Sequence, residues 1–352
     1  MKKPRMHFIC AGILLALTTV LVLIAKFLTS FWFSFYTDFS RNAMGFFGSL
    51  WSWAPFPVWE LLLVLLIVGL NVAFINSIRK KFFPMFFAVF LEITMLLVFL
   101  FMGLWGLNHL APTIGEQTGL QVEEYSSDQL RDAAAYYAEM ASYYSTEVER
   151  DANGDLVLPD FTTLSSEAVT AYGYLAENNP RFNLPVLHVK PLLVSKAFAY
   201  MGVSGIFICY TGEPAVSTAS YSLSQPFTIC HELGHSLAVA RENEANYLAF
   251  LACRASMNDL FRYSGYYNAF IYCYNALCAE DAEAAAGLWD YCTEELIHDS
   301  NVHVEHNKQY EGKVQEAAQA VNDVYLKTFT ESGVKSYGLV VDYLIAEYLR
   351  GE

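Results

Sequence analysis

The residues best suited to chemistry are two histidines and a glutamate in the second half of the chain. The segment His231-Glu232-Leu233-Gly234-His235 has the pattern HExxH. On a helix, side chains at i and i+4 share one face about 6 Å apart, so both imidazoles can bind one Zn²⁺ while Glu232 reaches a water molecule beside it. The pattern arises by chance in roughly one per cent of chains of this composition. The motif suggests zinc-dependent hydrolysis and needs further support.

A third ligand is available shortly after the motif. Seven residues after His235 the chain reads Glu242-Asn243-Glu244-Ala245-Asn246. A catalytic zinc site needs three protein ligands and one open position, and Glu242 supplies the third if the chain reverses around residues 239–241. Asn246, one helical turn later, would then accept the free ring N–H of a ligating histidine. Alternatively, Glu242 is an ordinary acidic residue at a helix N-terminus, or Glu244, about 200° away, is the ligand.

The motif must lie on a helix that follows a small sheet. Ser224-Gln225-Pro226 predicts the helix start, with a capping hydroxyl and a proline in the first turn. Apolar neighbours such as Cys230 and Leu233 favour a buried metal-binding face over a solvated one. Short apolar runs separated by Gly and Pro predict three strands, at Leu184–Val189, Ile206–Tyr210 and Ala215–Thr218.

Glu232 is the predicted general base. Zinc lowers the pKa of a water molecule to about 7, Glu232 accepts its proton and later delivers it to the leaving amine, and the metal polarises the scissile carbonyl. Residues 205–210 are either an edge strand that pairs with an extended peptide or a buried strand. The oxyanion also needs a donor. The downstream candidates, among which the sequence does not choose, are His298, His303, His306, Tyr263 and Tyr337.

The first third of the chain has the composition of a membrane region. Residues 1–107 contain eight Lys or Arg and three Asp or Glu, whereas residues 108–352 contain 13 and 33. Three apolar runs predict transmembrane helices at about residues 8–28, 58–78 and 82–107. The first run is too long for a signal peptide and has no clear cleavage site.

Residues 31–56, rich in Phe, Trp and Tyr, predict an interfacial loop. Glu92, in the third run, is either functional or simply neutral or facing a neighbouring helix.

Basic residues set the expected orientation. Lys2, Lys3 and Arg5 precede the first span, and residues 79–81, Arg-Lys-Lys, join the second to the third. The positive-inside rule places both segments in the cytoplasm. We therefore expect a multi-pass protein of the cell membrane with a cytoplasmic N-terminus, the lipid bilayer as one partner, and residues 108–352 outside.

Residues 108–352 are predicted to form one mostly helical domain. Their excess of acidic residues excludes a nucleic-acid binder that relies on a basic surface. The expected partner is a peptide or protein substrate of the predicted hydrolytic site. The cysteines contain no CxxC pair and are expected to be buried free thiols. Helical periodicity covers Ser127–Tyr144, Ser165–Glu177, Glu242–Asp259, Tyr267–Leu277, Ala282–His298, Glu305–Lys327 and Tyr337–Leu349.

Two resemblances extend this interpretation. HExxH followed by E-x-x-A-N is similar to the gluzincin metallopeptidases, although the gap from His235 to Glu242 is short and Asn246 stands where Asp is more usual. Nearly the whole chain also resembles the bacterial family called domain of unknown function 3810. The segments that carry this second resemblance are Trp105-Gly106-Leu107-Asn108, Lys190-Pro191, Ser204-Gly205-Ile206, Tyr210-Thr211-Gly212-Glu213, Pro226–Glu232, Glu242–Asn246, Tyr263-Ser264-Gly265-Tyr266 and Asn322–Lys327.

The resemblances imply the fold class and leave the substrate open. They imply a membrane-anchored α+β protein, in which three transmembrane helices precede a mostly helical, zincin-like domain with a small β-sheet. The expected function is that of a membrane-anchored zinc metallopeptidase that hydrolyses peptide bonds at the extracytoplasmic face. The alternative is a catalytically silent, zinc-containing sensor or interaction module, against which an intact Glu232 argues.

Overall fold

The computed structural model describes residues 4–329 and 339–351 and divides into two compact units. The N-terminal unit consists of Met1–Ala111 together with Ile208–Glu213, and the C-terminal unit of Pro112–Phe207 and Pro214–Glu352. The boundary thus lies just after Ala111 instead of at Leu107. A short segment from the second half of the sequence also belongs to the N-terminal unit.

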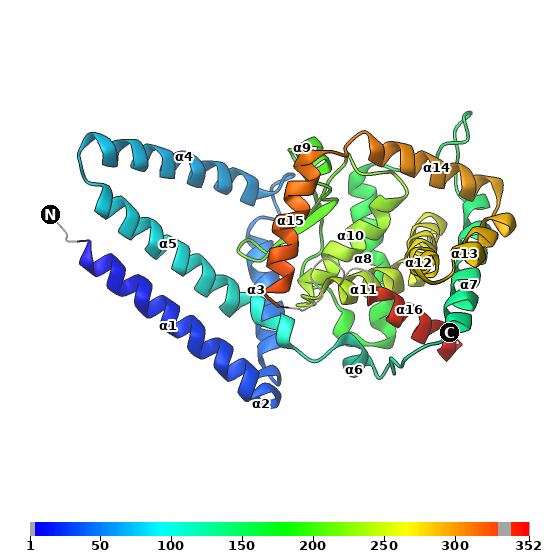
Figure 1. Ribbon diagram of the computed structural model, residues 1–352, viewed down its shortest axis with the longest axis horizontal. Helices are drawn as coiled ribbons and strands as arrows, with labels where there is room; N and C mark the ends of the chain where they lie inside the picture. Colours follow the sequence, from blue (N-terminus) through cyan, green and yellow to red (C-terminus); the bar gives the residue numbers. More distant parts are fainter. Residues whose placement is uncertain (1–3, 330–338, 352) are drawn as a thin grey trace. The chain divides into compact units, whose positions relative to one another are not determined.

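Three helices of the N-terminal unit are long and apolar enough to cross a membrane, as predicted: α1 (Arg5–Phe27), α4 (Val58–Arg79) and α5 (Phe83–Leu104). The third ends before residue 107 because a 3-10 turn, Gly106–Leu110, replaces its last turn. Helix α5 lies between α1 and α4 and packs against both (Figure 1). Glu92 of α5 faces His7 of α1, with 2.5 Å between its Oε2 and the Nδ1 of the histidine. Of the interpretations open for Glu92, contact with a neighbouring helix is the one that the structure shows.

The predicted interfacial loop at residues 31–56 is wrong, because most of this segment is helical. It contains the end of α2 (Thr29–Phe33) and all of α3 (Tyr36–Leu50). Tyr36, Ser40, Met44 and Gly48 recur every four residues and form the buried face of α3. The Tyr36 hydroxyl donates to the carbonyl of Met102 at 2.9 Å, and Ser40 donates to that of Leu104 at 2.6 Å. The four-residue spacing of these buried residues is therefore typical of a helix, although the aromatic composition of the segment suggested a loop.

The segment Ile208–Glu213 is bonded into the N-terminal unit. Both carboxylate oxygens of the buried Glu213 accept backbone N–H groups of α4, from Val58 at 3.0 Å and from Trp59 at 3.1 Å. This carboxylate supplies acceptors that the first turn of a helix lacks. Gly212 has a φ of 64°, and a Cβ there would lie 2.7 Å from the backbone N of Gly48 in α3. Positive φ and close approach both require glycine.

The C-terminal unit is mostly helical, as predicted. Its core is formed by large aromatic side chains, among them Tyr137, Tyr172, Tyr263 and Phe250, each less than 2% exposed. All seven cysteines of the chain are free thiols, but Cys278 is exposed, contrary to the prediction that they are buried. The helices are α6 (Ile114–Thr118), α7 (Ser127–Thr146), α8 (Phe161–Asn178), α9 (Ser195–Tyr200), α10 (Ser224–Ser236), α11 (Glu242–Ala255), α12 (Asp259–Glu280), α13 (Ala282–Leu288), α14 (Glu294–Lys308), α15 (Lys313–Lys327) and α16 (Val340–Arg350), with 3-10 turns at Pro180–Phe182 and Trp289–Tyr291.

Two of the predicted helices are each interrupted. The range Ala282–His298 is broken by the 3-10 turn Trp289–Tyr291, after which the Thr293 side chain caps α14 by accepting from the N–H of Leu296. The range Glu305–Lys327 is broken where α14 ends at Lys308 and α15 begins after Gly312. Apolar periodicity continued across both breaks and did not reveal them.

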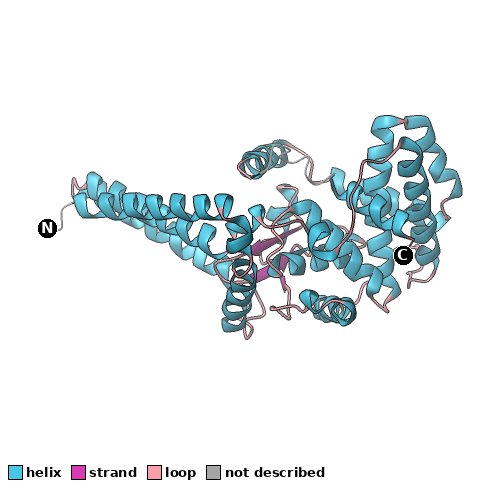
Figure 2. Ribbon diagram, turned by 90° about the horizontal axis from the view of Figure 1, so that it is seen from below, coloured by secondary structure: helices cyan, strands magenta, loops and turns pink. Residues whose placement is uncertain are grey.

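The sheet is small, as Figure 2 shows in magenta, and its strands are β1 (Lys190–Pro191), β2 (Gly205–Ile208) and β3 (Glu213–Val216). Their order is β1-β3-β2, and β1 runs parallel to β3 with Lys190 opposite Ala215. The strand predicted at Leu184–Val189 is wrong, since strand begins only at Lys190. The Val189 N–H donates to the Ser165 hydroxyl at 2.8 Å instead of to a ladder, and Pro191 has no N–H to donate.

Candidate metal centre

Helix α10 carries both histidines and is buried from Gln225 to Ser236. The hydroxyl of Ser224 does not cap it, contrary to the prediction, because the N-cap position falls on Leu223 and no side chain bonds there as a cap. Ser264 of α12 performs the task instead. Its hydroxyl accepts from the N–H of Phe227 at 3.2 Å and donates to the Leu223 carbonyl at 2.5 Å. The start of the HExxH helix is therefore fixed by a neighbouring helix.

A tight reversal after α10 brings Glu242 back to the histidines. Ala238 adopts a left-handed φ of 66°, a conformation that costs an L-residue about 1–2 kcal/mol. The reversal directs the Val239 carbonyl toward His235, whose Nδ1–H donates to it at 2.8 Å. Helix α11 then begins at Glu242 itself. One strained residue thus accommodates the short spacing between the motif and Glu242.

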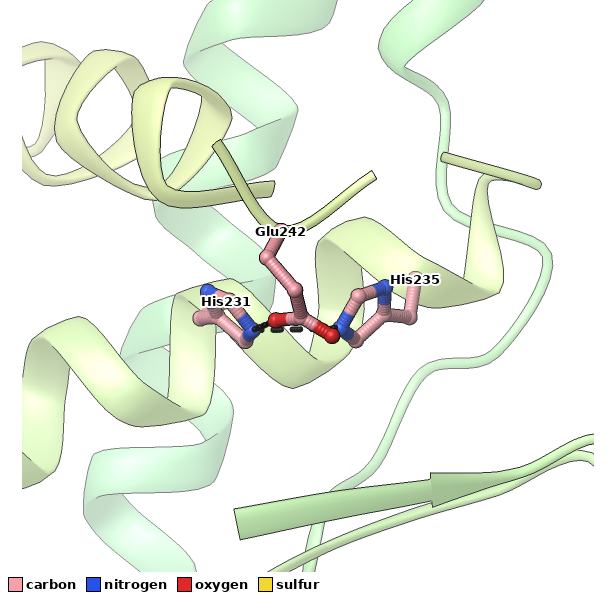
Figure 3. Close-up of side chains that lie close together, drawn as sticks. All are labelled: His231, His235 and Glu242. Atoms are coloured by element: carbon pink, nitrogen blue, oxygen red, sulfur yellow. Dashed lines mark hydrogen bonds and ion pairs between the residues drawn. The ribbon is translucent and has the colours of Figure 1, made fainter. Parts of the chain in front are cut away.

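Three side-chain atoms converge at this point (Figure 3). The Nε2 atoms of His231 and His235 are 3.1 Å apart. Glu242 Oε2 lies 3.2 Å from the Nε2 of His231 and 3.8 Å from that of His235. In tetrahedral coordination with bonds of about 2.0–2.1 Å, neighbouring ligand atoms are about 3.3–3.4 Å apart. The His231, His235 and Glu242 cluster could therefore hold a metal ion.

Hydrogen bonds on the far side of each ring determine which way the two Nε2 atoms face. The Nδ1–H of His235 donates to a backbone carbonyl, which can only accept, and His231 Nδ1 lies 2.8 Å from Asn246 Oδ1. Both neutral rings therefore direct the Nε2 lone pair toward Glu242. Burial lowers the pKa of His231, but the hydrogen bond to Glu242 and the charges of Glu232 and Glu242 outweigh it and raise that pKa. Burial lowers the pKa of His235 to about 4. The carboxylates thus favour positive charge at His231, whereas burial keeps His235 neutral.

Glu232 is buried beside the two histidines. It is 4% exposed, and within the described part of the chain its Oε2 has no hydrogen-bond partner. Burial raises the pKa of Glu232 to about 8; His231 lowers it, and the Glu242 charge raises it further. A cation beside it would lower that pKa again by charge attraction. The buried, unpaired oxygen fits a site in which a water molecule lies between Glu232 and a metal.

Glu244 is directed elsewhere. Its Oε1 accepts from Arg241 Nη1 at 2.7 Å, from the Ile114 N–H at 3.3 Å and from the Tyr343 hydroxyl at 3.4 Å. Burial raises the pKa of Glu244, while the Arg241 charge opposes that rise. The structure thus places Glu242 with the histidines and uses Glu244 to bind α11 to α6 and α16.

The downstream candidates for the oxyanion donor are bonded to other partners. Tyr263 donates to Asp299 at 2.6 Å, His298 lies 2.9 Å from Asp155, and His303 lies 2.8 Å from the Tyr267 hydroxyl. His306 Nε2 lies 2.9 Å from the Ala219 carbonyl. Tyr337 lies outside the described residues. The structure does not bring the four described side chains to the three converging atoms in the way that it brings Asn246.

Two residues near the site were not singled out from the sequence. A Cβ on Gly205 of β2 would lie 2.7 Å from Glu232 Cγ and 2.8 Å from its Cδ, so the strand backbone packs directly on the glutamate. A glycine inside a predicted strand is the signal that could have indicated this approach. Tyr272 of α12 lies close enough to Glu242 for that charge to add to burial in raising the pKa of its phenol. Nothing in the sequence distinguishes it from the other tyrosines of α12.

Comparison with known proteins places the chain in a family. The model of the family described as "Protein of unknown function (DUF3810)" matches residues 34–345, which include α3 to α15 and all three converging ligands. No curated protein and no solved structure matches the chain. Because the match covers most of its length, the chain belongs to the DUF3810 family.

Proposed function

We propose that this protein is a membrane-anchored, zinc-dependent metallopeptidase. The observation that carries the proposal is the convergence of two imidazole Nε2 atoms and one carboxylate oxygen within 3.1–3.8 Å, with both Nδ1 atoms engaged on the far side. Two nitrogens and one oxygen form the donor set of a catalytic zinc site that keeps one open position. Zinc is the metal that this donor set fits best.

Each residue then has a defined task. Bound zinc would polarise a scissile carbonyl and lower the pKa of a water molecule. Glu232 accepts the proton from that water and delivers it to the leaving amine. Asn246 and the Val239 carbonyl hold the two rings so that each Nε2 faces the metal position. The position of Glu232, buried and with Oε2 unpaired among the described residues, suits this transfer.

The sheet suggests how a peptide would be held. In the order β1-β3-β2, strand β2 stands at the edge, so one of its sides is not paired with another strand of the sheet. Gly205, its first residue, packs on Glu232. An extended peptide that pairs with β2 would have its backbone aligned beside the general base. This favours the edge-strand interpretation of residues 205–208 and a peptide substrate.

Tyr272 is our candidate for the oxyanion donor in place of the downstream residues. Its phenol lies near the Glu242 charge, and within the described residues it makes no hydrogen bond. Its burial raises its pKa, so the hydroxyl keeps its proton and remains a donor at neutral pH. Replacing one such donor in other hydrolases reduces kcat about 10²–10³-fold. Tyr272→Phe should do so with zinc content unchanged.

The experiment that tests the function uses the full chain in detergent. Zinc content is measured by mass spectrometry, and cleavage of a peptide library is compared with that by Glu232→Gln, which keeps all three ligands. We expect stoichiometric zinc in both proteins and cleavage only by the unmodified chain. Zinc without cleavage in either would favour the silent sensor. Absence of bound metal would contradict the proposal.

A further inference from the structure

We infer that α4 is a contact between two copies of this chain, centred on Asn71. The inference goes beyond the proposed peptidase activity and rests only on the proposed membrane anchoring. Asn71 lies 13 residues after Val58 and eight before Arg79, which is about 20 Å and about 12 Å along a helix. In a hydrocarbon layer of about 30 Å, it lies well inside. Its short side chain cannot reach either surface.

The amide of Asn71 is incompletely bonded for such a position. Its Nδ2 donates to the Ile67 carbonyl of the same helix at 2.8 Å. Among the described residues, its second N–H and its Oδ1 make no hydrogen bond. Asn side chains in spanning helices hydrogen-bond across to neighbouring helices, because hydrocarbon offers them no partner. Asn71 therefore indicates a partner that the single chain does not supply.

The surroundings of Asn71 form a face suited to helix packing. At 100° per residue, Val64 and Ile78 lie about 20° from Asn71, and Ile67 and Ile75 about 40° from it. All four of these aliphatic side chains are exposed. The spacing places a polar amide in the middle of a stripe of β-branched residues, which is the pattern by which a single Asn sets register and partner number in paired helices. We call these five residues the Asn71 face.

The Asn71 face points away from α5. Helix α4 meets α5 with Leu66, Gly69 and Ala73, which line a cavity of about 270 Å³ together with Phe86 and Phe90. Gly69 and Ala73 are about 160° from Asn71 around the helix. Most of the contact within the chain thus lies opposite the Asn71 face, and Phe74, about 60° from Asn71, also contacts Phe83 and Phe86 of α5.

The partner that fits is a second copy. Identical chains inserted in the same orientation place Asn71 at the same depth on parallel helices. An amide is both donor and acceptor, so two Asn71 side chains can bond to each other reciprocally. A helix of a different protein would need a polar residue at that same depth.

Cysteine cross-linking in native membranes tests the contact. Two valines of α4 have nearly equal exposure: Val64, on the Asn71 face, is 55% exposed, and Val72, about 100° from Asn71, is 53% exposed. The full chain carrying Val64→Cys or Val72→Cys is co-expressed with two different tags, oxidised, and compared with the unmodified chain. We expect disulfide-linked pairs that carry both tags for Val64→Cys and not for Val72→Cys.

A second substitution tests the amide itself. Asn71→Leu, added to Val64→Cys, should reduce cross-linking about three- to twentyfold, the loss expected for one hydrogen bond between helices. An unchanged thermal unfolding temperature shows that this variant is folded. Equal cross-linking at both valines, no effect of Asn71→Leu, or a link only to another protein would overturn the inference. A chain absent from the membrane fraction would overturn the membrane anchoring as well. The peptidase proposal is tested separately, by peptide cleavage with the unmodified chain.

Discussion

Glu242 and Glu244 stand two positions apart on α11, but their carboxylates contact different groups. Glu242 Oε2 lies 3.2 Å from His231 Nε2, whereas Glu244 accepts from Arg241 at 2.7 Å. We predict that Glu242→Ala loses zinc and that Glu244→Gln, which keeps the hydrogen-bonding shape, retains it. Asn246→Ala should weaken zinc binding about 10- to 100-fold, because it supports a ligand and is not one. Titration with a competing chelator measures all three.

The same titration can refute the assignment. If Glu244→Gln lost zinc while Glu242→Ala kept it, the arrangement seen around Arg241 would not be that of the metal-bound protein. Equal loss in both variants would show that the N-terminus of α11 matters as a whole and that neither carboxylate acts alone as ligand.

His303 gives a pH dependence that is separate from the metal centre. Its ring stacks on Tyr221, with centroids 4.7 Å apart, and burial, with help from the His306 charge, lowers its pKa to about 4. The unfolded chain, with an ordinary histidine pKa near 6.5, therefore binds the proton more readily. The contribution of His303 to the free energy of unfolding is therefore complete above about pH 6.5. It is lost as the pH falls toward 4, which lowers the free energy of unfolding by about 1–3 kcal/mol.

The measurement is thermal unfolding of the full chain between pH 4 and 8, compared with His303→Gln, which can still bond to Tyr267. Between pH 6.5 and 4, we expect the unfolding temperature of the variant to fall less than that of the unmodified chain. Above pH 7, the two unfolding temperatures should change with pH in the same way. Parallel curves over the whole range would show that His303 is not the group that titrates.

At the scale of elements, β2 and α10 meet at Gly205 and Glu232. A Cβ at Gly205 would lie 2.7 Å from Glu232 Cγ, closer than side-chain atoms approach each other, so the glutamate must move. We predict that Gly205→Ala lowers kcat at least tenfold and leaves zinc content unchanged, because the base moves and the ligands do not. Gly173→Ala in α8 is the control, since a Cβ there meets nothing within 4 Å. Loss of zinc in Gly205→Ala would mean that the strand also positions the ligands.

Elements that repeat a local pattern were predictable, and elements held by remote partners were not. The spans α1, α4 and α5 and the helix α7 were indicated by apolar composition or period over many residues. The amphipathic helix α3 was hidden because aromatic residues lie on its exposed side as well as on its buried one. Its buried face is defined by contacts with Met102 and Leu104, more than 60 residues away, on which local sequence carries no information.

The candidate site shows the same division. Helical spacing within α10 and the start of α11 indicated His231, His235, Glu242 and Asn246 from the sequence. Ser264, which fixes the start of α10, and Gly205, which packs on Glu232, come from other elements. Such contacts depend on how elements pack, and periodicity within one element does not report them.

At the scale of the whole molecule, the two units differ in charge as well as in architecture. The excess of basic residues in 1–107 and of acidic residues in 108–352 suits an anchor beside an anionic lipid surface and a domain in water. The segment Ile208–Glu213 links the units along the chain, because Glu213 caps α4 while the residues on either side of the segment, Phe207 and Pro214, belong to the C-terminal unit. Glu213→Ala should therefore leave two N–H groups of α4 without this acceptor.

The orientation in the membrane is the last prediction, and it follows from where the basic residues stand. Lys2, Lys3 and Arg5 precede α1, and residues 79–81 lie between α4 and α5. If both segments stay in the cytoplasm, three spans place everything after α5 outside. An alkaline phosphatase fused after Leu110 should be active and one fused after Lys81 inactive, with a fluorescent cytoplasmic reporter giving the reverse pattern. Activity of the phosphatase at Lys81 alone would mean that the chain is inverted, and activity at both positions would mean that α5 does not cross. Inversion would place the candidate metal centre in the cytoplasm, whereas activity at both positions would leave it outside.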